Sequence, residues 1–479
     1  MKTTGSVVRS IVGVLVTLFM FSWPAVSFAD EVSDLRQEVE KMNKKLEQLE
    51  AGNQKSEEED FQSFEFHGYS RAGFGWNQDG GTGNRYRWNY DASGLDEHYF
   101  RLGNESHNAY TNLTLIKNIK TDDQSFAKFV TSLIIEPRDE DNWEPTEVVP
   151  RQLYAELGNF SWAPGVTFWA GEKWYRHPGD QHITDWQFLD IAGYGGGVGD
   201  IPLGEKTKLS IAALGFIDEN DYMTDNGEPA SYVVDIRAEE IPMGDIGNIL
   251  LQFAPTWTTG GKLTEPTDTG ETELESESGW MSALYLNFDT FFGMMKGNGR
   301  LIARYGSGYG STLFNNRYMV PNPVTTNIDW SNSNRWSVGL DGLMEISDNF
   351  QIMPVIAYQQ FDNGLEENNN ITKILFGSRL KYSVNDNFAL QLEPGGVYLD
   401  SEPSATSGGD HLEDTLWKVT FAPTIQPKKG FWARPEIRFF VTYAWWGDKE
   451  STQYLDDNAG LDPDDTSGFT YGIQMEVWF

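Results

Sequence analysis

The last eleven residues, 469–479, constrain the fold of this chain more than any other segment. One set of alternate residues is apolar: Phe469, Tyr471, Ile473, Met475, Val477 and Phe479. The intervening set is Thr470, Gly472, Gln474, Glu476 and Trp478. Successive side chains of a β-strand point to opposite faces, so one face of this strand is wholly apolar. Lipid on one side and water on the other suits both faces, which is the pattern of a transmembrane β-barrel. The alternative is a half-buried strand of a soluble β-sandwich.

The composition is compatible with one large barrel. The chain has 479 residues, no cysteine, 48 glycines and a formal net charge of −35. Its mean hydropathy is −0.48, and after the N-terminal region no stretch is apolar enough for a spanning helix. A barrel needs none, because its lipid contacts come from alternating residues. The negative charge repels phosphates, which argues against nucleic acid as a partner.

Residues 1–29 have the pattern of a secretory signal peptide. Lys2 and Arg9 form the positive region, Ile11 to Met20 the apolar region, and Ser27-Phe-Ala29 the small-residue cleavage context. The mature chain is therefore expected to begin at Asp30. Export without cysteine means that no disulfide framework supports the fold.

Residues 30–50 have a heptad pattern. Apolar residues are spaced alternately by three and four positions: Val32, Leu35, Val39, Met42, Leu46 and Leu49. Three heptads are too short for a stable isolated helix, so the pattern predicts a self-associating coiled coil. The alternative is one amphipathic helix docked on its own protein. Residues 51–60 are polar and read as a linker.

Residues 61–479 read as strands and turns. Outward-facing apolar sets run from Trp336 to Ile346 and from Ile374 to Val384, and each is followed by a short Ser, Asp or Asn turn and another strand. Longer polar connections are predicted at 77–96, 260–279 and 448–467. This region therefore predicts an all-β fold, an antiparallel transmembrane barrel of roughly 16–20 strands with short turns at one rim and long loops at the other. A barrel of that size is wide enough for a water-filled lumen.

Several motifs in this region resemble the maltoporin family of carbohydrate porins. They are Phe66-His-Gly-Tyr-Ser-Arg-Ala-Gly-Phe-Gly-Trp76, Phe100-Arg-Leu-Gly-Asn-Glu105, Asn142-Trp-Glu144, Trp169-Ala-Gly171, Trp432-Ala-Arg-Pro435 and Gln474-Met-Glu-Val-Trp478. The N-terminal heptads resemble the periplasmic extension of the sucrose-porin branch. The resemblance implies a homotrimer of 18-stranded barrels in the outer membrane of a Gram-negative bacterium, in contact with lipid and lipopolysaccharide. It also implies a periplasmic N-terminal helix and an inward-folded loop in each pore.

Residue chemistry independently favours a sugar path. A pyranose has an apolar C–H face and a belt of hydroxyl groups, which suit aromatic rings and charged hydrogen-bonding groups respectively. By parity, Tyr69, Tyr110, Trp432 and Trp478 are predicted on the water face of four strands, with Arg71 and Arg434 beside them. For each aromatic residue alone, the alternative is an interfacial girdle residue or a packed tyrosine. Together they favour a row of rings along the lumen.

The family resemblance implies roles for individual residues. The aromatic slide carries over as Tyr69, Tyr110, Trp432 and Trp478, with Trp143 reaching the pore mouth of a neighbouring subunit. The polar track carries over as Arg71, Arg101, Arg151, Arg176 and Asp185, with Asp190 near the constriction. The inward-folded loop is predicted at Trp174 to Gly199, with the glycine run 193–197 providing sharp turns.

The chain departs from the family pattern at several points. The segment between Glu105 and Tyr110 is one residue longer than in the usual pattern of the family. Asn298 stands where the slide usually has phenylalanine, Gln187 where a constriction tyrosine is usual, and Asn112 in place of a track glutamate. These departures affect one stacking position and one wall of the constriction. They predict a sugar specificity that is broader than, or different from, that for malto-oligosaccharides.

The predicted function is facilitated diffusion of maltodextrins, other oligosaccharides or disaccharides, with no chemical step. No cofactor is predicted. An enzyme is disfavoured because the chain has no G-x-S-x-G, P-loop or H-E-x-x-H motif. His177 and His182 with Asp180 and Asp185 are an alternative metal cluster, although polar loop residues explain them better.

Two further functional alternatives stay open. One is a general, nonspecific porin, and the other is an envelope tether or adhesin without sugar selectivity. In the second case the acidic loop 456–465 would bind structural Ca²⁺ or the cations that bridge lipopolysaccharide. Its spacing fits no EF-hand, so simple solvation is the favoured interpretation of that loop.

Overall fold

The computed structural model describes residues 62–83, 86–88, 99–103, 109–121, 123–137, 146–175, 182–184, 191–217, 230–259, 261–264, 271–314, 328–365, 370–402, 411–456 and 461–479. The chain divides into two units, Met1–Phe61 and Gln62–Phe479, and all described residues belong to the second. The predicted signal peptide at 1–29, the coiled coil at 30–50 and the linker at 51–60 therefore lie outside the described residues.

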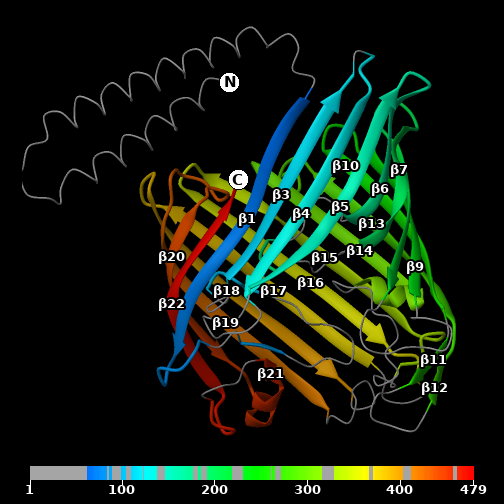
Figure 1. The fold of residues 1–479 in the computed structure, drawn as a ribbon. Coiled ribbons are helices and arrows are strands. Elements are labelled where there is room, and N and C mark those ends of the chain that lie inside the picture. Colours follow the sequence, from blue (N-terminus) through cyan, green and yellow to red (C-terminus); the bar gives the residue numbers. More distant parts are fainter. Residues whose placement is uncertain are drawn as a thin grey trace, which may run out of the picture. The chain divides into compact units, whose positions relative to one another are not determined.

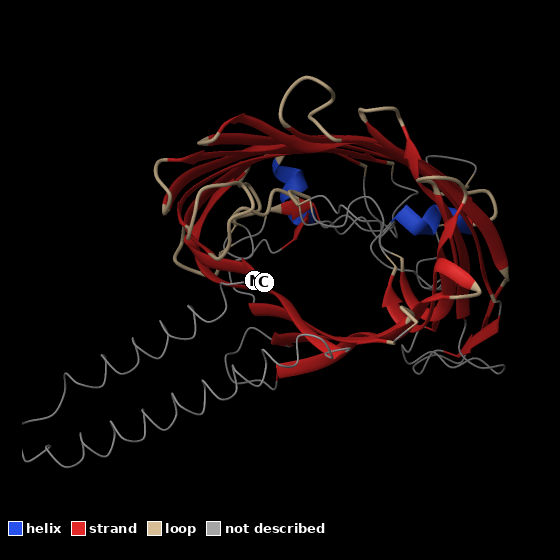
Figure 2. Ribbon diagram, turned by 90° about the horizontal axis from the view of Figure 1, so that it is seen from above, coloured by secondary structure: helices blue, strands red, loops and turns tan. Residues whose placement is uncertain are grey.

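The second unit is a closed antiparallel barrel with 18 strands (Figures 1 and 2). Its strands are β1 (Gln62–Asn77), β3 (Ala109–Lys120), β4 (Phe126–Pro137), β5 (Thr146–Phe160), β6 (Ala163–Trp174), β7 (Ala192–Pro202), β8 (Lys208–Ile217), β9 (Ala230–Pro242), β10 (Gly247–Thr258), β13 (Glu277–Phe288), β14 (Gly297–Gly308), β15 (Asn334–Ser347), β16 (Phe350–Asp362), β17 (Asn370–Ser383), β18 (Phe388–Ser401), β19 (Leu412–Ile425), β20 (Glu436–Trp445) and β22 (Ser467–Trp478). Strand β1 closes the barrel by pairing with both β3 and β22. The predicted fold class is confirmed.

Short and long connections alternate along the chain. The turn between β17 and β18 is short because the Asn385 carboxamide oxygen accepts the backbone N–H groups of Asn387 and Phe388, each at 2.9 Å. The longer connections contain the paired strands β2 (Arg87–Trp88) and β21 (Leu455–Asp456), the hairpin β11 (Gly261–Thr264) and β12 (Glu271–Leu274), and the 3₁₀ helices η1 (Tyr309–Phe314) and η4 (Lys449–Tyr454). Among the described helices, none is long and apolar enough to cross a membrane.

The last strand shows the predicted alternation. Phe469 and Tyr471 are 45% and 44% exposed on the outer face, whereas Gln474 and Glu476 are 2% and 3% exposed on the inner face. Apolar residues outside and polar residues inside are the reverse of a soluble protein, so the soluble-sandwich alternative is wrong.

Outward-facing aromatic side chains gather near both ends of the strands. Trp417 and Trp445 stack with ring centroids 6.0 Å apart, near the long connections. Phe160 and Trp162 stack at 5.4 Å, at the short turn between β5 and β6. Two such groups match the aromatic girdles that flank the apolar band of a transmembrane barrel.

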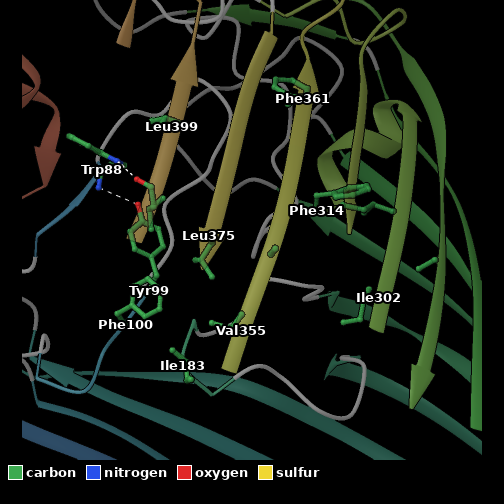
Figure 3. Close-up of a cluster of buried hydrophobic side chains, with 14 of the residues drawn as sticks. Trp88, Tyr99, Phe100, Ile183, Ile302, Phe314, Val355, Phe361, Leu375 and Leu399 are labelled. Carbon is green, nitrogen blue, oxygen red and sulfur yellow. Dashed lines mark hydrogen bonds between the residues drawn. The ribbon is translucent and has the colours of Figure 1, made fainter. Parts of the chain in front are cut away.

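The connection between β1 and β3 folds against the inner wall (Figure 3). The Trp88 indole N–H donates to the Val397 carbonyl oxygen of β18 at 3.1 Å. Phe100 is fully buried against β17 and β18, where Gly377 and Gly395 leave room for its ring. A Cβ atom at these glycines would lie 2.2 and 2.3 Å from carbons of that ring. The described residues of the first long connection, 86–88 and 99–103, are therefore part of the lumen lining, which sequence reasoning did not predict.

The assignment of the glycine run 193–197 to an inward loop is wrong. These residues lie in β7, paired with β6 and β8. Glycine is needed here for close packing: a Cβ at Gly197 would lie 2.7 Å from the Trp169 indole nitrogen. Between β6 and β7 the described residues are Tyr175, His182–Thr184 and Ile191, of which Ile183, Thr184 and Ile191 are fully buried.

Candidate functional site

The candidate site lies on the inner wall where β1 is flanked by β3 and β22. Within the sheet, Tyr69 is the Cα partner of Trp478, and Arg71 is the partner of Glu476. On its other side, Arg71 is the partner of Tyr110. Antiparallel pairing thus brings side chains that are distant in sequence into one patch of the lumen wall.

Four predicted aromatic residues form two neighbouring pairs in this patch. The ring centroids of Tyr69 and Tyr110 are 6.0 Å apart, and those of Trp432 and Trp478 are 6.3 Å apart. Trp432 precedes β20 and is 44% exposed. Because Tyr69 and Trp478 are register partners, the pairs adjoin each other. The fifth predicted aromatic residue, Trp143, lies outside the described residues.

Two buried carboxylates, Glu436 and Glu476, face each other across β20 and β22. Glu476 accepts hydrogen bonds from the Tyr69 hydroxyl at 3.1 Å, from Arg434 Nε at 3.0 Å and from Arg438. Glu436 accepts from Arg438 Nε at 2.8 Å and from Lys381. Buried charges need partners of this kind, because an unpaired one carries a large desolvation penalty. The network fixes the arginines beside the aromatic rings.

Arginines contact three of the four rings. Arg71 lies over the Tyr110 ring at 4.9 Å, and Arg434 lies over the Trp478 ring at 3.8 Å. Arg101 donates to the Tyr69 hydroxyl at 2.8 Å. The side chains of Arg101 and Arg434 are buried and hold the rings in place. The partly exposed Arg71 is placed where a polyhydroxylated ligand on the Tyr110 ring would find charged donors.

His182 is part of this patch, and sequence reasoning did not assign it there. Its Nε2 atom lies 2.9 Å from Arg379 Nη1 and 3.3 Å from Arg434 Nη2. Arginine can only donate, so Nε2 accepts and the ring is neutral with its proton on Nδ1. Burial and the positive charge of Arg379 hold the pKa of His182 well below its ordinary value. The described residues hold no group of three metal-binding side chains around it.

The chain matches the LamB porin family model over residues 64–479. It belongs to the LamB porin family. Three solved structures resemble it at low identity. The outer membrane channel DcaP of Acinetobacter baumannii has 12% identity, a TM-score of 0.43, and coverage of 88% of this chain and 98% of that chain. An anion-selective porin from Comamonas acidovorans has 11% identity, a TM-score of 0.39, and coverage of 87% of this chain and 100% of that chain. OmpT of Vibrio cholerae has 10% identity, a TM-score of 0.36, and coverage of 88% of this chain and 99% of that chain.

As a LamB porin, the protein is an outer-membrane channel, and its family and fold are those of channel proteins rather than enzymes.

The remaining predicted site residues do not join the aromatic patch among the residues that the structure describes. Arg151 lies on β5, two strands away from β3 across β4, and so apart from the aromatic pairs. Arg176, Asp185 and Asp190 lie outside the described residues.

Two departures from the family pattern are visible in this LamB porin. Asn112 is the register partner of Tyr69, and its side-chain oxygen accepts from the Ser132 hydroxyl at 2.6 Å. Asn298, at the start of β14, accepts from the Leu343 backbone N–H at 3.1 Å. Both amides are thus engaged with the wall itself. Gln187 lies outside the described residues.

Proposed function

We propose that this LamB porin is a carbohydrate-selective channel for maltodextrins or other oligosaccharides and disaccharides, which cross by facilitated diffusion. The observation that supports the proposal is the register of β1 and β22. It sets the tyrosine pair beside the tryptophan pair on the lumen wall, with arginines in contact with both pairs and the Glu476 carboxylate in contact with Tyr69. A nonspecific porin has no need for such a row.

The chemistry of a sugar explains the arrangement. The apolar face of a pyranose ring would stack on Tyr110 or Trp432, whereas its hydroxyl groups would hydrogen-bond with the partly exposed Arg71. Two adjoining ring pairs offer successive weak sites. Transport requires binding that is strong enough to recruit a sugar and weak enough to release it.

The proposal also includes residues and features outside the aromatic patch. Trp143, Arg151, Arg176, Asp185 and Asp190 are proposed as further contacts along the path. The functional unit is proposed to be a homotrimer, exported by the signal peptide at 1–29, with the helix at 30–50 in the periplasm. No cofactor or catalytic residue is included in the proposal.

Trp432→Ala is expected to weaken sugar binding about fivefold, because one aromatic stacking contact is worth on the order of 1 kcal/mol. The measurement is the block of ion current by maltose oligomers and sucrose in planar bilayers. Trp417→Ala is the matched control, since Trp417 lies on the outer face in the girdle and is 39% exposed. It should leave the block unchanged.

Sugars that fail to block the wild-type current at any concentration would favour a nonspecific porin or a tether instead. Equal block of the wild-type and Trp432→Ala channels would show that the aromatic row does not contribute to sugar binding. Trp478→Ala, measured in the same assay, shows whether the second member of the tryptophan pair also contributes to sugar block.

A further inference from the structure

The imidazole of His182 fills the space beside both tryptophans of the proposed sugar path. Its ring centroid is 5.2 Å from that of Trp432 and 5.7 Å from that of Trp478, in edge contacts at 63° and 87°. The two tryptophan centroids are 6.3 Å apart, so the three rings form a compact triangle. Aromatic surface that a sugar could stack on is thus partly used by the protein itself.

Both sides of the segment that contains His182 are held in place. On one side, Nε2 accepts from Arg379 of β17 and from Arg434. On the other, the Ile183 carbonyl oxygen accepts the Phe100 backbone N–H at 2.9 Å. The imidazole is therefore placed by hydrogen bonds that exist only while it is neutral.

The geometry points to His182 as a specificity-determining residue: a wedge that a sugar must displace before it can stack on the surface of Trp432 and Trp478 that the imidazole covers. This inference rests on the proposed function and deepens it. An extended sugar chain can pass the wedge one ring at a time, whereas a bent oligosaccharide needs more width at the same point. The wedge should therefore select for extended chains.

The decisive variant is His182→Ala, compared with wild type in planar bilayers. The probes are two trisaccharides of equal mass, the extended maltotriose and the bent raffinose. Removing the wedge should raise single-channel conductance and tighten the maltotriose block about two- to tenfold, the size of one freed aromatic contact. Raffinose block should tighten more, so that the discrimination between the two sugars decreases.

His182→Gln tests whether the neutral acceptor is what matters. The Gln carboxamide oxygen can accept from both arginines, and the variant should block like wild type at neutral pH. This variant also decides the question if His182→Ala fails to form a barrel, which heat-modifiable mobility on SDS gels would reveal.

The pH dependence of sugar block distinguishes this role of His182 from a purely structural one. The charged groups facing the imidazole are Arg379, Arg434 and Arg101, opposed by Glu476. Because the pKa of docked His182 is lowered, protonation favours the released segment. Below about pH 6.5, the ordinary pKa, docking should weaken by up to tenfold per pH unit. Wild-type block should then approach that of His182→Ala, while His182→Gln should not respond in this way.

His411→Gln is the control for acid effects, because His411 is an exposed histidine paired with Asp400 at 2.9 Å, remote in sequence from the site. It should retain the wild-type acid response. Equal sugar discrimination in wild type and His182→Ala, or an acid response retained by His182→Gln, would overturn the inference. If Trp432→Ala still weakens the block, the proposed function stands without the wedge. If it does not, the function itself fails.

Discussion

Replacing Glu476 by alanine is expected to lower the free energy of unfolding of the barrel by about 3–5 kcal/mol, the usual cost of removing one partner of a buried ion pair. Glu476 is 3% exposed and accepts from Arg434 and Arg438. Its removal leaves two buried guanidinium groups with only Glu436 between them. Tyr69 also loses an acceptor for its hydroxyl. Denaturant titration of the barrel in detergent, followed by heat-modifiable mobility, measures the loss.

Glu345→Ala is the matched control for this prediction. Glu345 pairs with Lys296 at 2.6 Å, but the two side chains are 31% and 75% exposed. Exposed pairs contribute about 0–1 kcal/mol, so this variant should unfold close to the wild-type midpoint. Equal stability of the Glu476→Ala and Glu345→Ala variants would mean that water replaces the carboxylate in the network.

Phe100→Ala is expected to release the first connection from the barrel wall. Phe100 is fully buried, and burial of a phenylalanine side chain is worth about 3–5 kcal/mol relative to alanine. Its backbone has φ +54°, in the left-handed region, so tertiary packing must offset a local cost of about 1–2 kcal/mol. The barrel strands should persist, while single-channel conductance and protease cleavage near residues 86–103 both increase.

A second variant tests the same contact from the wall. Gly395→Val places side-chain atoms where the Phe100 ring lies, so it should reproduce the Phe100→Ala phenotype. Phe439→Ala is the control, because Phe439 is 50% exposed on the outer face of β20. Wild-type conductance and protease resistance in both Phe100→Ala and Gly395→Val would show that other contacts hold this connection.

The barrel could be predicted because its signal is local. Alternation with a period of two assigns each side chain of β22 to a face, and the exposure of Phe469 and the burial of Glu476 follow it. The same parity placed Tyr69 and Trp478 on the water side. It could not show that they are register partners, since strand register depends on closure of the whole sheet.

The inward segments could not be predicted because their contacts are long-range. Phe100 docks on Gly377 and Gly395, and neither glycine has a local sequence signal that distinguishes it from a turn glycine. For the same reason the glycine run of β7 has the sequence pattern of a loop, although Gly197 is required by the Trp169 ring. Sequence alone indicates His182 only as a metal-ligand candidate, because its contacts with Trp432 and Arg434 join residues about 250 positions apart.

The docking of the first connection has a consequence for attempts to widen the channel. Beneath it the wall has buried aliphatic side chains, among them Leu375 and Leu399 (Figure 3). Deleting the connection would expose these apolar side chains to the water in the lumen. A truncated channel would therefore be wider but less stable, because each Å² of newly exposed apolar wall costs about 25 cal/mol.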